Sequence, residues 1–204
     1  MMNRPAKLLD VVAAMGANLE RSITVKIRTG WDEKNPSAHK LLPQLQKLSC
    51  SRKIGAVMIH GRSRLQRYSK LADWDYVLAA AQSQDPTLPL LPVIGNGDIM
   101  SWDDWKEHQF LVDNFQSSDP DTESIKLVNC PMVGRGALIK PWLPSELKEQ
   151  RHIDISATER LDIVRYTSLP RLSSVTVGWG LPPSSVQRHC WLGLHIHSTD
   201  RPLY

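Results

Sequence analysis

Polar residues close four successive apolar runs of this sequence, and their types could support chemistry on a bound ligand. They are Lys26, His60, Asn96 and the glycine-rich segment that begins at Gly134. Each follows the previous one by roughly 35 residues, about the length of one βα unit. Repetition at this spacing predicts that the four positions meet at one edge of a parallel sheet.

Lys26 and His60 each allow a structural and a functional interpretation. Lys26 lies between Val25 and Ile27, so a strand that turns those two toward helices turns Lys26 the other way, into a barrel interior. A lysine buried there needs an anionic partner, either a neighbouring carboxylate or a ligand that becomes negative during reaction, such as a reduced flavin ring. His60 could be a structural hydrogen-bonding residue, or it could converge with Lys26 over the same opening.

Two glycine-rich segments follow the last two apolar runs, Gly95-Asn96-Gly97-Asp98 and Gly134-Arg135-Gly136. Glycine lets backbone N–H groups approach a phosphate, and a following helix adds its positive end. Ordinary turns use the same residues. Two such segments at successive strand ends favour a phosphate site, with Arg135 as a charged donor.

The segment after His60 is basic, with Arg62, Arg64, Arg67 and Lys70 and no acidic residue among them. Such a run can simply be a solvated face. On a loop at the opening of a site it could instead contact a polyanion, with Tyr68 as a stacking surface.

The elements that must position these residues alternate between strand and helix patterns. Strands are predicted at about 22–30, 56–61, 90–98 and 125–133, and helices at 5–20, 37–48, 74–82, from 101 toward 110, and 141–149. This order predicts an α/β fold with a parallel sheet, as in a (β/α)₈ TIM barrel, whose chemistry lies at the carboxyl ends of the strands. Four strands are half of such a barrel. We therefore expect residues 1–150 to form a partial barrel, with two unpaired sheet edges.

Composition excludes several classes of protein. The 204 residues carry 25 Lys and Arg against 21 Asp and Glu, a surplus too small to indicate nucleic acid by itself. No apolar run approaches the ~18 residues of a membrane span. Cys50, Cys130 and Cys190 lack metal-ligand spacing, which argues against a zinc site or a disulfide framework and favours a reducing intracellular setting. Residues 151–165 predict the start of a helical region, with a capping box at Ser156–Glu159, and residues 166–204 predict an irregular tail.

Several motifs, in this order and spacing, resemble those of the tRNA-dihydrouridine synthases, most closely the eukaryotic synthase 3 branch. The resemblance runs from about Asn3 to Arg165 and rests on Val25-Lys26-Ile27-Arg28-Thr29-Gly30-Trp31, His60-Gly61-Arg62-Ser63-Arg64-Leu65-Gln66-Arg67-Tyr68, Leu71-Ala72-Asp73-Trp74, Gly95-Asn96-Gly97-Asp98 and Gly134-Arg135-Gly136-Ala137-Leu138-Ile139-Lys140-Pro141-Trp142.

This resemblance implies an FMN-linked barrel that uses NAD(P)H to reduce a uridine of tRNA, at position 47, to dihydrouridine. It implies that Lys26 contacts the flavin ring and favours its anionic reduced form, and that His60 contacts the flavin near its ring and ribityl chain. Residues implied to hold the cofactor, chiefly at its phosphate, are Asn96, Gly97, Asp98, Gly134 and Arg135. Arg62, Arg64 and Arg67 would meet RNA phosphates. No metal and no membrane are expected, and the setting would be the cytoplasm or the nucleus.

The sequence departs from the family in its cysteines. The family's proton donor is a Cys in an Asn-x-Gly-Cys-Pro motif on a loop expected before the first segment seen here. Asn129-Cys130-Pro131 lacks the Gly and lies at the wrong strand, so no catalytic Cys is assigned. The helical domain that follows the family's barrel is matched only to about Arg165, which suggests a truncated or alternatively spliced chain. Three alternatives follow: an enzyme of this family represented by part of its chain, a non-catalytic RNA-binding or unstable fragment of it, and another FMN barrel acting on a small molecule.

Overall fold

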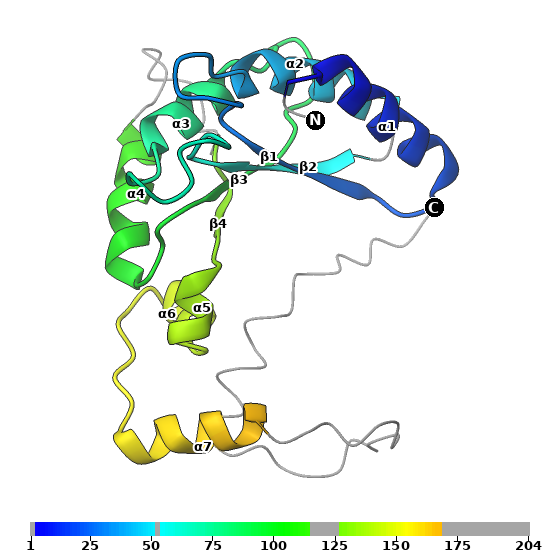
Figure 1. Ribbon diagram of the computed structural model, residues 1–204. Helices are drawn as coiled ribbons and strands as arrows, with labels where there is room; N and C mark the ends of the chain where they lie inside the picture. Colours follow the sequence, from blue (N-terminus) through cyan, green and yellow to red (C-terminus); the bar gives the residue numbers. More distant parts are fainter. Residues whose placement is uncertain (1–2, 52–53, 115–126, 169–204) are drawn as a thin grey trace. The chain divides into compact units, whose positions relative to one another are not determined.

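The computed structural model describes residues 3–51, 54–114 and 127–168, which form two compact units. The first unit comprises residues 1–99 and 104–134, and the second comprises 100–103 and 135–204. The elements (Figure 1) are α1 (Pro5–Asn18), β1 (Ile23–Arg28), α2 (Ala38–Ser49), β2 (Ile54–His60), α3 (Trp74–Gln82), β3 (Val93–Asn96), α4 (Trp102–Asn114), β4 (Cys130–Met132), α5 (Arg135–Ile139), α6 (Leu143–Glu149) and α7 (Ala157–Ser168). None of the described helices is long and apolar enough to cross a membrane.

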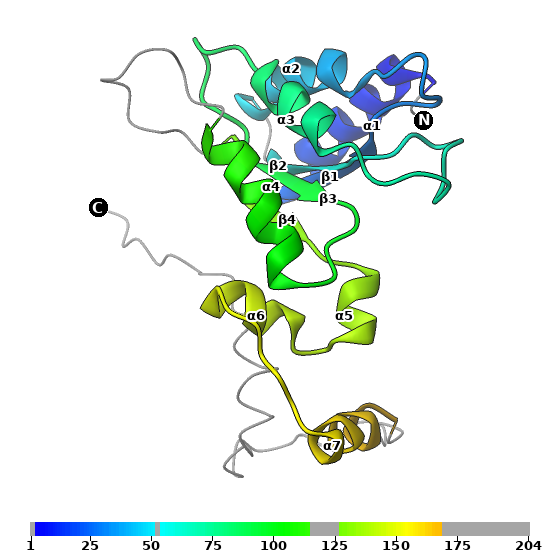
Figure 2. The ribbon, with the colours of Figure 1, turned by 90° about the vertical axis from the view of Figure 1, so that its left-hand side faces the viewer.

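The first unit is built on a four-stranded parallel sheet in the order β1-β2-β3-β4. The predicted parallel α/β arrangement is thus confirmed. Strands β1 and β2 begin within two residues of their predicted starts, and β3 and β4 are shorter than predicted. Helices α1, α2 and α3 lie on the same side of this sheet, as Figures 1 and 2 both show, and α1, α2 and α3 pack on β1, β2 and β3 respectively. Among the described residues, no helix of this unit lies on the opposite face of the sheet.

Alternation along the strands explains this one-sided cover. Ile23, Val25 and Ile27 are buried under the helices, whereas Lys26, between the last two, is exposed on the other face. The covering helix α2 presents leucines at helical spacing, of which Leu41 is 2% exposed. Apolar burial of this kind, rather than intrinsic propensity, holds the helices on the sheet.

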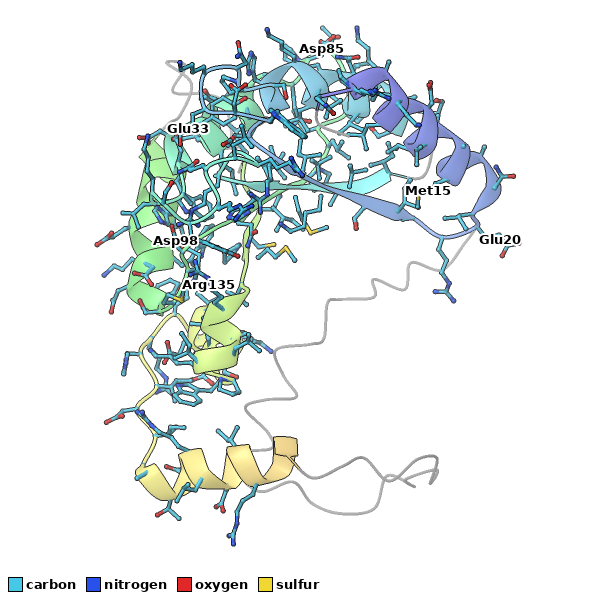
Figure 3. All side chains as sticks on the ribbon, in the orientation of Figure 1. Met15, Glu20, Glu33, Asp85, Asp98 and Arg135 are labelled. Carbon is cyan, nitrogen blue, oxygen red and sulfur yellow. The ribbon has the colours of Figure 1, made fainter. Side chains whose placement is uncertain are left out.

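Helix α1 is covered only in part. Leu8, Leu9, Val12 and Met15 recur at helical spacing along α1, and Val12 is 4% exposed. Met15, however, is 44% exposed (labelled in Figure 3). The apolar face of α1 therefore extends beyond the surface that the described part of the chain covers.

The second unit contains α5, α6 and α7 around a small core of Trp142, Ile153 and Ile163. Because α6 shares this core, the first unit ends at Gly134, before the boundary expected at residue 150. Helix α5 was not predicted. The capping box is confirmed, since Ser156 N donates to Glu159 Oε2 at 2.8 Å and Glu159 N donates to Ser156 Oγ at 3.3 Å. Helix α7 continues to residue 168, past the expected tail boundary at 166, and residues 169–204 lie outside the described residues.

Candidate functional site

The carboxyl ends of three neighbouring strands bring Lys26, His60 and Asn96 together. Lys26 Nζ donates to Asn96 Oδ1 at 3.0 Å, and Asn96 Nδ2 donates to Met132 O on β4 at 2.7 Å. His60 is the register partner of Asn96 on one side and of Arg28 on the other. The predicted convergence of these positions at one sheet edge is therefore confirmed within the first unit.

Lys26 differs from the expectation of a buried lysine. It is exposed, because no described helix of its unit covers its face of the sheet, and its ammonium donates to an amide oxygen rather than to a carboxylate. Partial desolvation, followed by the nearby charge of Arg28, lowers the pKa of Lys26. The result is an accessible ammonium group that is held in place by Asn96.

His60 lies at the end of β2 and is 8% exposed. Desolvation lowers the pKa of His60 to about 4, and the positive charges of Lys26, Arg28 and Arg62 act in the same direction against a smaller opposing effect of Asp98. At neutral pH the imidazole is therefore uncharged. A neutral imidazole can donate one hydrogen bond and accept another, but it adds no positive charge to the site.

Arg62 does not occupy the exposed position expected of an RNA contact. Its side chain is 3% exposed, Nη2 pairs with Asp98 Oδ2 at 2.5 Å, and Nε donates to Lys70 O at 2.8 Å. A buried guanidinium with these partners cannot reach an RNA phosphate without leaving an unpaired carboxylate behind. The structure thus corrects this expectation: Arg62 belongs to the interior of the site.

The glycines of the segment after β3 are required by the protein's own packing. Gly97 has φ +133°, and a Cβ there would lie 2.4 Å from the Ala72 Cβ. A Cβ at Gly95 would lie 2.2 Å from the Trp74 ring, whose Nε1 donates to Gly97 O at 3.0 Å. Tight approach of α3 to β3 therefore explains both glycines, and their suggested role at a phosphate stays a prediction.

The other residues predicted to bind the phosphate lie in different settings. Asp98 (labelled in Figure 3) follows β3 and accepts hydrogen bonds from Arg62 and from Ala72 N, at 2.7 Å from the latter. Gly134 comes two residues after β4, and a Cβ there would meet no described atom within 4 Å. Arg135 begins α5 and so belongs to the second unit. A phosphate site formed by these residues therefore stays a prediction.

The loop after β1 and the loop after β2 are tied to each other. The Arg64 guanidinium lies 4.2 Å from the centre of the Trp31 ring, Arg64 N donates to Gly30 O at 3.0 Å, and Lys70 Nζ pairs with Glu33 Oε2 at 2.6 Å. We call residues 61–73 the basic loop. On it Arg64 and Arg67 are exposed, which leaves both available to a polyanion.

Sequence reasoning missed the role of Arg28 and of Trp31. Arg28 Nη1 donates to Ser63 O at 2.8 Å, so it anchors the basic loop while its charge acts on His60 and Lys26. The strand period of two places Arg28 on the same face as Lys26, and this signal could have identified it. Nothing in the spacing of Trp31 and Arg64 indicates that they stack.

Cys130 is not set up as an activated thiol. Cys50 and Cys130 are free, and desolvation raises the pKa of the Cys130 thiol. A raised pKa reduces the thiolate fraction and with it the reactivity of the group.

A sequence model described as "Dihydrouridine synthase (Dus)" matches residues 1–168. The chain belongs to the dihydrouridine synthase family. It is 44% identical over 165 residues to a human protein named tRNA-dihydrouridine(47) synthase [NAD(P)(+)]-like, a match that covers 81% of this chain and 22% of the relative. A Coprinopsis cinerea protein named tRNA-dihydrouridine(47) synthase [NAD(P)(+)] is 42% identical over 171 residues, covering 81% of this chain and 23% of the relative.

Similarity within the dihydrouridine synthase family also extends to plants. An Arabidopsis thaliana protein with the same "-like" name as the human one is 38% identical over 165 residues, which is 81% of this chain and 21% of the relative. The chain therefore spans about a fifth of the length of these curated relatives. The resemblance stated from the motifs is confirmed as family membership.

Proposed function

We propose that this chain forms part of an FMN-binding barrel of a tRNA-dihydrouridine synthase. The whole enzyme would use NAD(P)H to reduce a uridine of tRNA, at position 47, in the cytoplasm or the nucleus. Family membership supports the reaction class, and the names of the relatives support tRNA and NAD(P) as reactants. The half-barrel interpretation is supported by four parallel strands in sequential order with helices on one face only.

One observation carries the proposal for the cofactor: the accessible Lys26 ammonium lies 3.0 Å from Asn96 Oδ1, beside His60, on the helix-free face at the carboxyl ends of the strands. This is where barrel enzymes bind their ligands. The donor set fits a planar ring that carries electron-rich oxygen and nitrogen atoms. FMN, when bound, supplies the redox chemistry that links NAD(P)H to the uridine.

The residues of this chain would bind and orient rather than transfer protons. Lys26 supplies a positive charge, and Asn96 fixes the direction of that charge. His60, with a pKa of about 4, supplies a hydrogen bond without charge at neutral pH. Gly134 leaves room for a close approach of a ligand. We assign no proton donor among the described residues.

Arg64 and Arg67 are proposed to contact tRNA phosphates. Both are exposed on the basic loop, next to the strand ends where the uridine would have to arrive. The side chain of Tyr68 is 64% exposed and could stack on a base. Arg62 takes no part in this surface.

The proposal is tested by titrating the purified 204-residue chain with FMN and following the quenching of flavin fluorescence. We expect saturable binding, weakened about tenfold by Lys26→Gln, because a hydrogen bond from a charged donor is lost. Lys40→Gln, an exposed lysine on α2, is the matched control and should bind as the unsubstituted chain does. A soluble chain that binds tRNA but no FMN would instead favour the non-catalytic RNA-binding alternative.

A further inference from the structure

We propose that Arg62 is a positioning residue that fixes the tautomer of His60, so that His60 presents Nδ1–H to a ligand on the helix-free face of the sheet. The identity of that ligand rests on the proposed function. The tautomer itself rests only on the geometry of Arg62, Asp98 and His60.

Arg62 is held rigidly at both ends of its guanidinium group. Nη2 pairs with Asp98 Oδ2 at 2.5 Å, and Nε donates to Lys70 O at 2.8 Å. Asp98 is itself fixed, because the same oxygen accepts from Ala72 N at 2.7 Å. With 3% of its surface exposed, the side chain has no room to turn away. The remaining nitrogen, Nη1, therefore has a defined position.

That position is 3.5 Å from His60 Nε2. A guanidinium group has only donors and does not lose its charge in proteins, so it can face Nε2 favourably only if Nε2 offers a lone pair. The ring proton then lies on Nδ1. The opposite tautomer would place two N–H groups against each other. Because burial and nearby positive charges lower the pKa of His60 to about 4, the doubly protonated ring is not populated at neutral pH.

The two edges of the imidazole ring have different surroundings. A Cβ at Gly97 would lie 3.3 Å from His60 Cδ2 and 3.5 Å from Nε2, so this edge faces the protein. Among the described side chains, the polar atoms that are both buried and without a hydrogen bond comprise only His108 Nδ1. His60 Nδ1 is not among these atoms, so it remains accessible to a ligand. Strand alternation directs the ring toward the face that carries Lys26. A ligand acceptor there would meet Lys26 Nζ–H and His60 Nδ1–H together.

The first test is a long-range ¹H–¹⁵N correlation spectrum of the ¹⁵N-labelled 204-residue chain at pH 7, with His60 assigned by comparison with His60→Gln. We expect His60 Nδ1 to resonate as a protonated nitrogen and Nε2 as an unprotonated one. A protonated Nε2, in either the neutral or the charged ring, would overturn the inference. No cofactor is present in this measurement, so a chain with the expected tautomer but no affinity for FMN would leave the inference standing and the proposed function refuted.

Substitutions then test whether Arg62 is the cause. Arg62→Met, which keeps the length but has no donor, should raise the ratio of the Nε2–H to the Nδ1–H form about fivefold, as expected for one lost hydrogen bond. Arg62→Lys retains a cation without an acceptor and should keep the original tautomer. Arg64→Met, on the same loop but exposed, is the control and should leave the His60 spectrum unchanged. A folded Arg62→Met chain with an unaltered tautomer would refute the role of Arg62. If that variant does not fold, the spectrum of the unsubstituted chain still decides which tautomer His60 adopts.

Discussion

Positive charge is concentrated around one neutral histidine at the strand ends. Lys26, Arg28 and Arg62 all act on His60, and Asp98 is the only anion among the groups that shift its pKa. Arg62 and Asp98 neutralise each other at 2.5 Å, so the net field at the open face comes from Lys26 and Arg28. Such a field favours an anionic or electron-rich ligand edge. It also makes protonation of His60 costly, which has a consequence for stability.

His60 should make the stability of the chain depend on pH below neutrality. Its pKa is about 4 in the folded chain and near 6.5 when unfolded, so between these values the unfolded state binds more protons. Stability is therefore lost as the pH falls from about 6.5 toward 4. Urea unfolding measures the free energy of unfolding at pH 7 and at pH 4.5. The decrease between the two should be about 1–3 kcal/mol smaller in His60→Gln than in the unsubstituted chain. His152→Gln, an exposed histidine of the second unit, should not; equal losses with and without His60 would contradict the argument.

The loops after β3 and β4 look alike in sequence but differ in what their glycines do. Both follow a strand and both were predicted to approach a phosphate. Only Gly97 is enclosed by the protein, with its positive φ and its contact to Ala72, whereas Gly134 faces no described atom. A sequence pattern cannot separate these cases, because each requires the absence of a side chain for a different reason.

Alanine substitution should separate the two loops. Gly97→Ala forces a Cβ into a strained backbone and against Ala72, so we expect a loss of about 2 kcal/mol or more in the free energy of unfolding. Gly134→Ala should change stability by less than about 0.5 kcal/mol. If a ligand phosphate approaches Gly134, the same substitution should weaken FMN binding without altering the urea midpoint. A Gly97→Ala chain as stable as the unsubstituted one would contradict the packing explanation.

The basic loop is the element in which the sequence and the structure differ most. The sequence predicted that Arg62, Arg64 and Arg67 form one exposed surface. In the structure Arg62 is buried, and of these three residues only Arg64 and Arg67 can contact a polyanion. We expect the double variant Arg64→Gln/Arg67→Gln to bind tRNA more weakly and to reduce the slope of log K against log salt by about 2, one for each lost phosphate contact. Filter binding over a salt series measures this slope. Lys40→Gln is the control, and an unchanged slope in the double variant would remove the basic loop from the tRNA surface.

Across the whole molecule, the sequence predicted elements better than contacts. The strand and helix order, the parallel sheet and the capping box at Ser156 follow from local periodicity, and the structure has them. The exposure of Lys26 does not follow from it, since it depends on which face of the sheet is covered. The burial of Arg62 does not follow either, since it depends on a partner, Asp98, that lies far away in the chain. Helix α5, with five residues, is too short to show a period. The division of the described residues after Gly134 reflects the core that Trp142, before α6, shares with Ile153 and Ile163.

The second unit should be destabilised independently of the first by a change in its own core. Its core surrounds Glu146, which is 0% exposed and accepts from Trp142 Nε1 at 3.1 Å and from Ile153 N at 3.3 Å, with Lys140 Nζ at 3.4 Å. Glu146→Gln removes the charge that pairs with Lys140 and brings an NH2 group into a buried site, at a cost of about 3 kcal/mol. Hydrogen exchange should therefore show faster exchange at α6 and α7, while β1, β2 and β3 keep their protection, because each unit has its own core. Glu149→Gln, which weakens the exposed ion pair with Arg151, is the matched control and should change exchange in both units far less. Equal loss of protection in the sheet would mean that the two units unfold together.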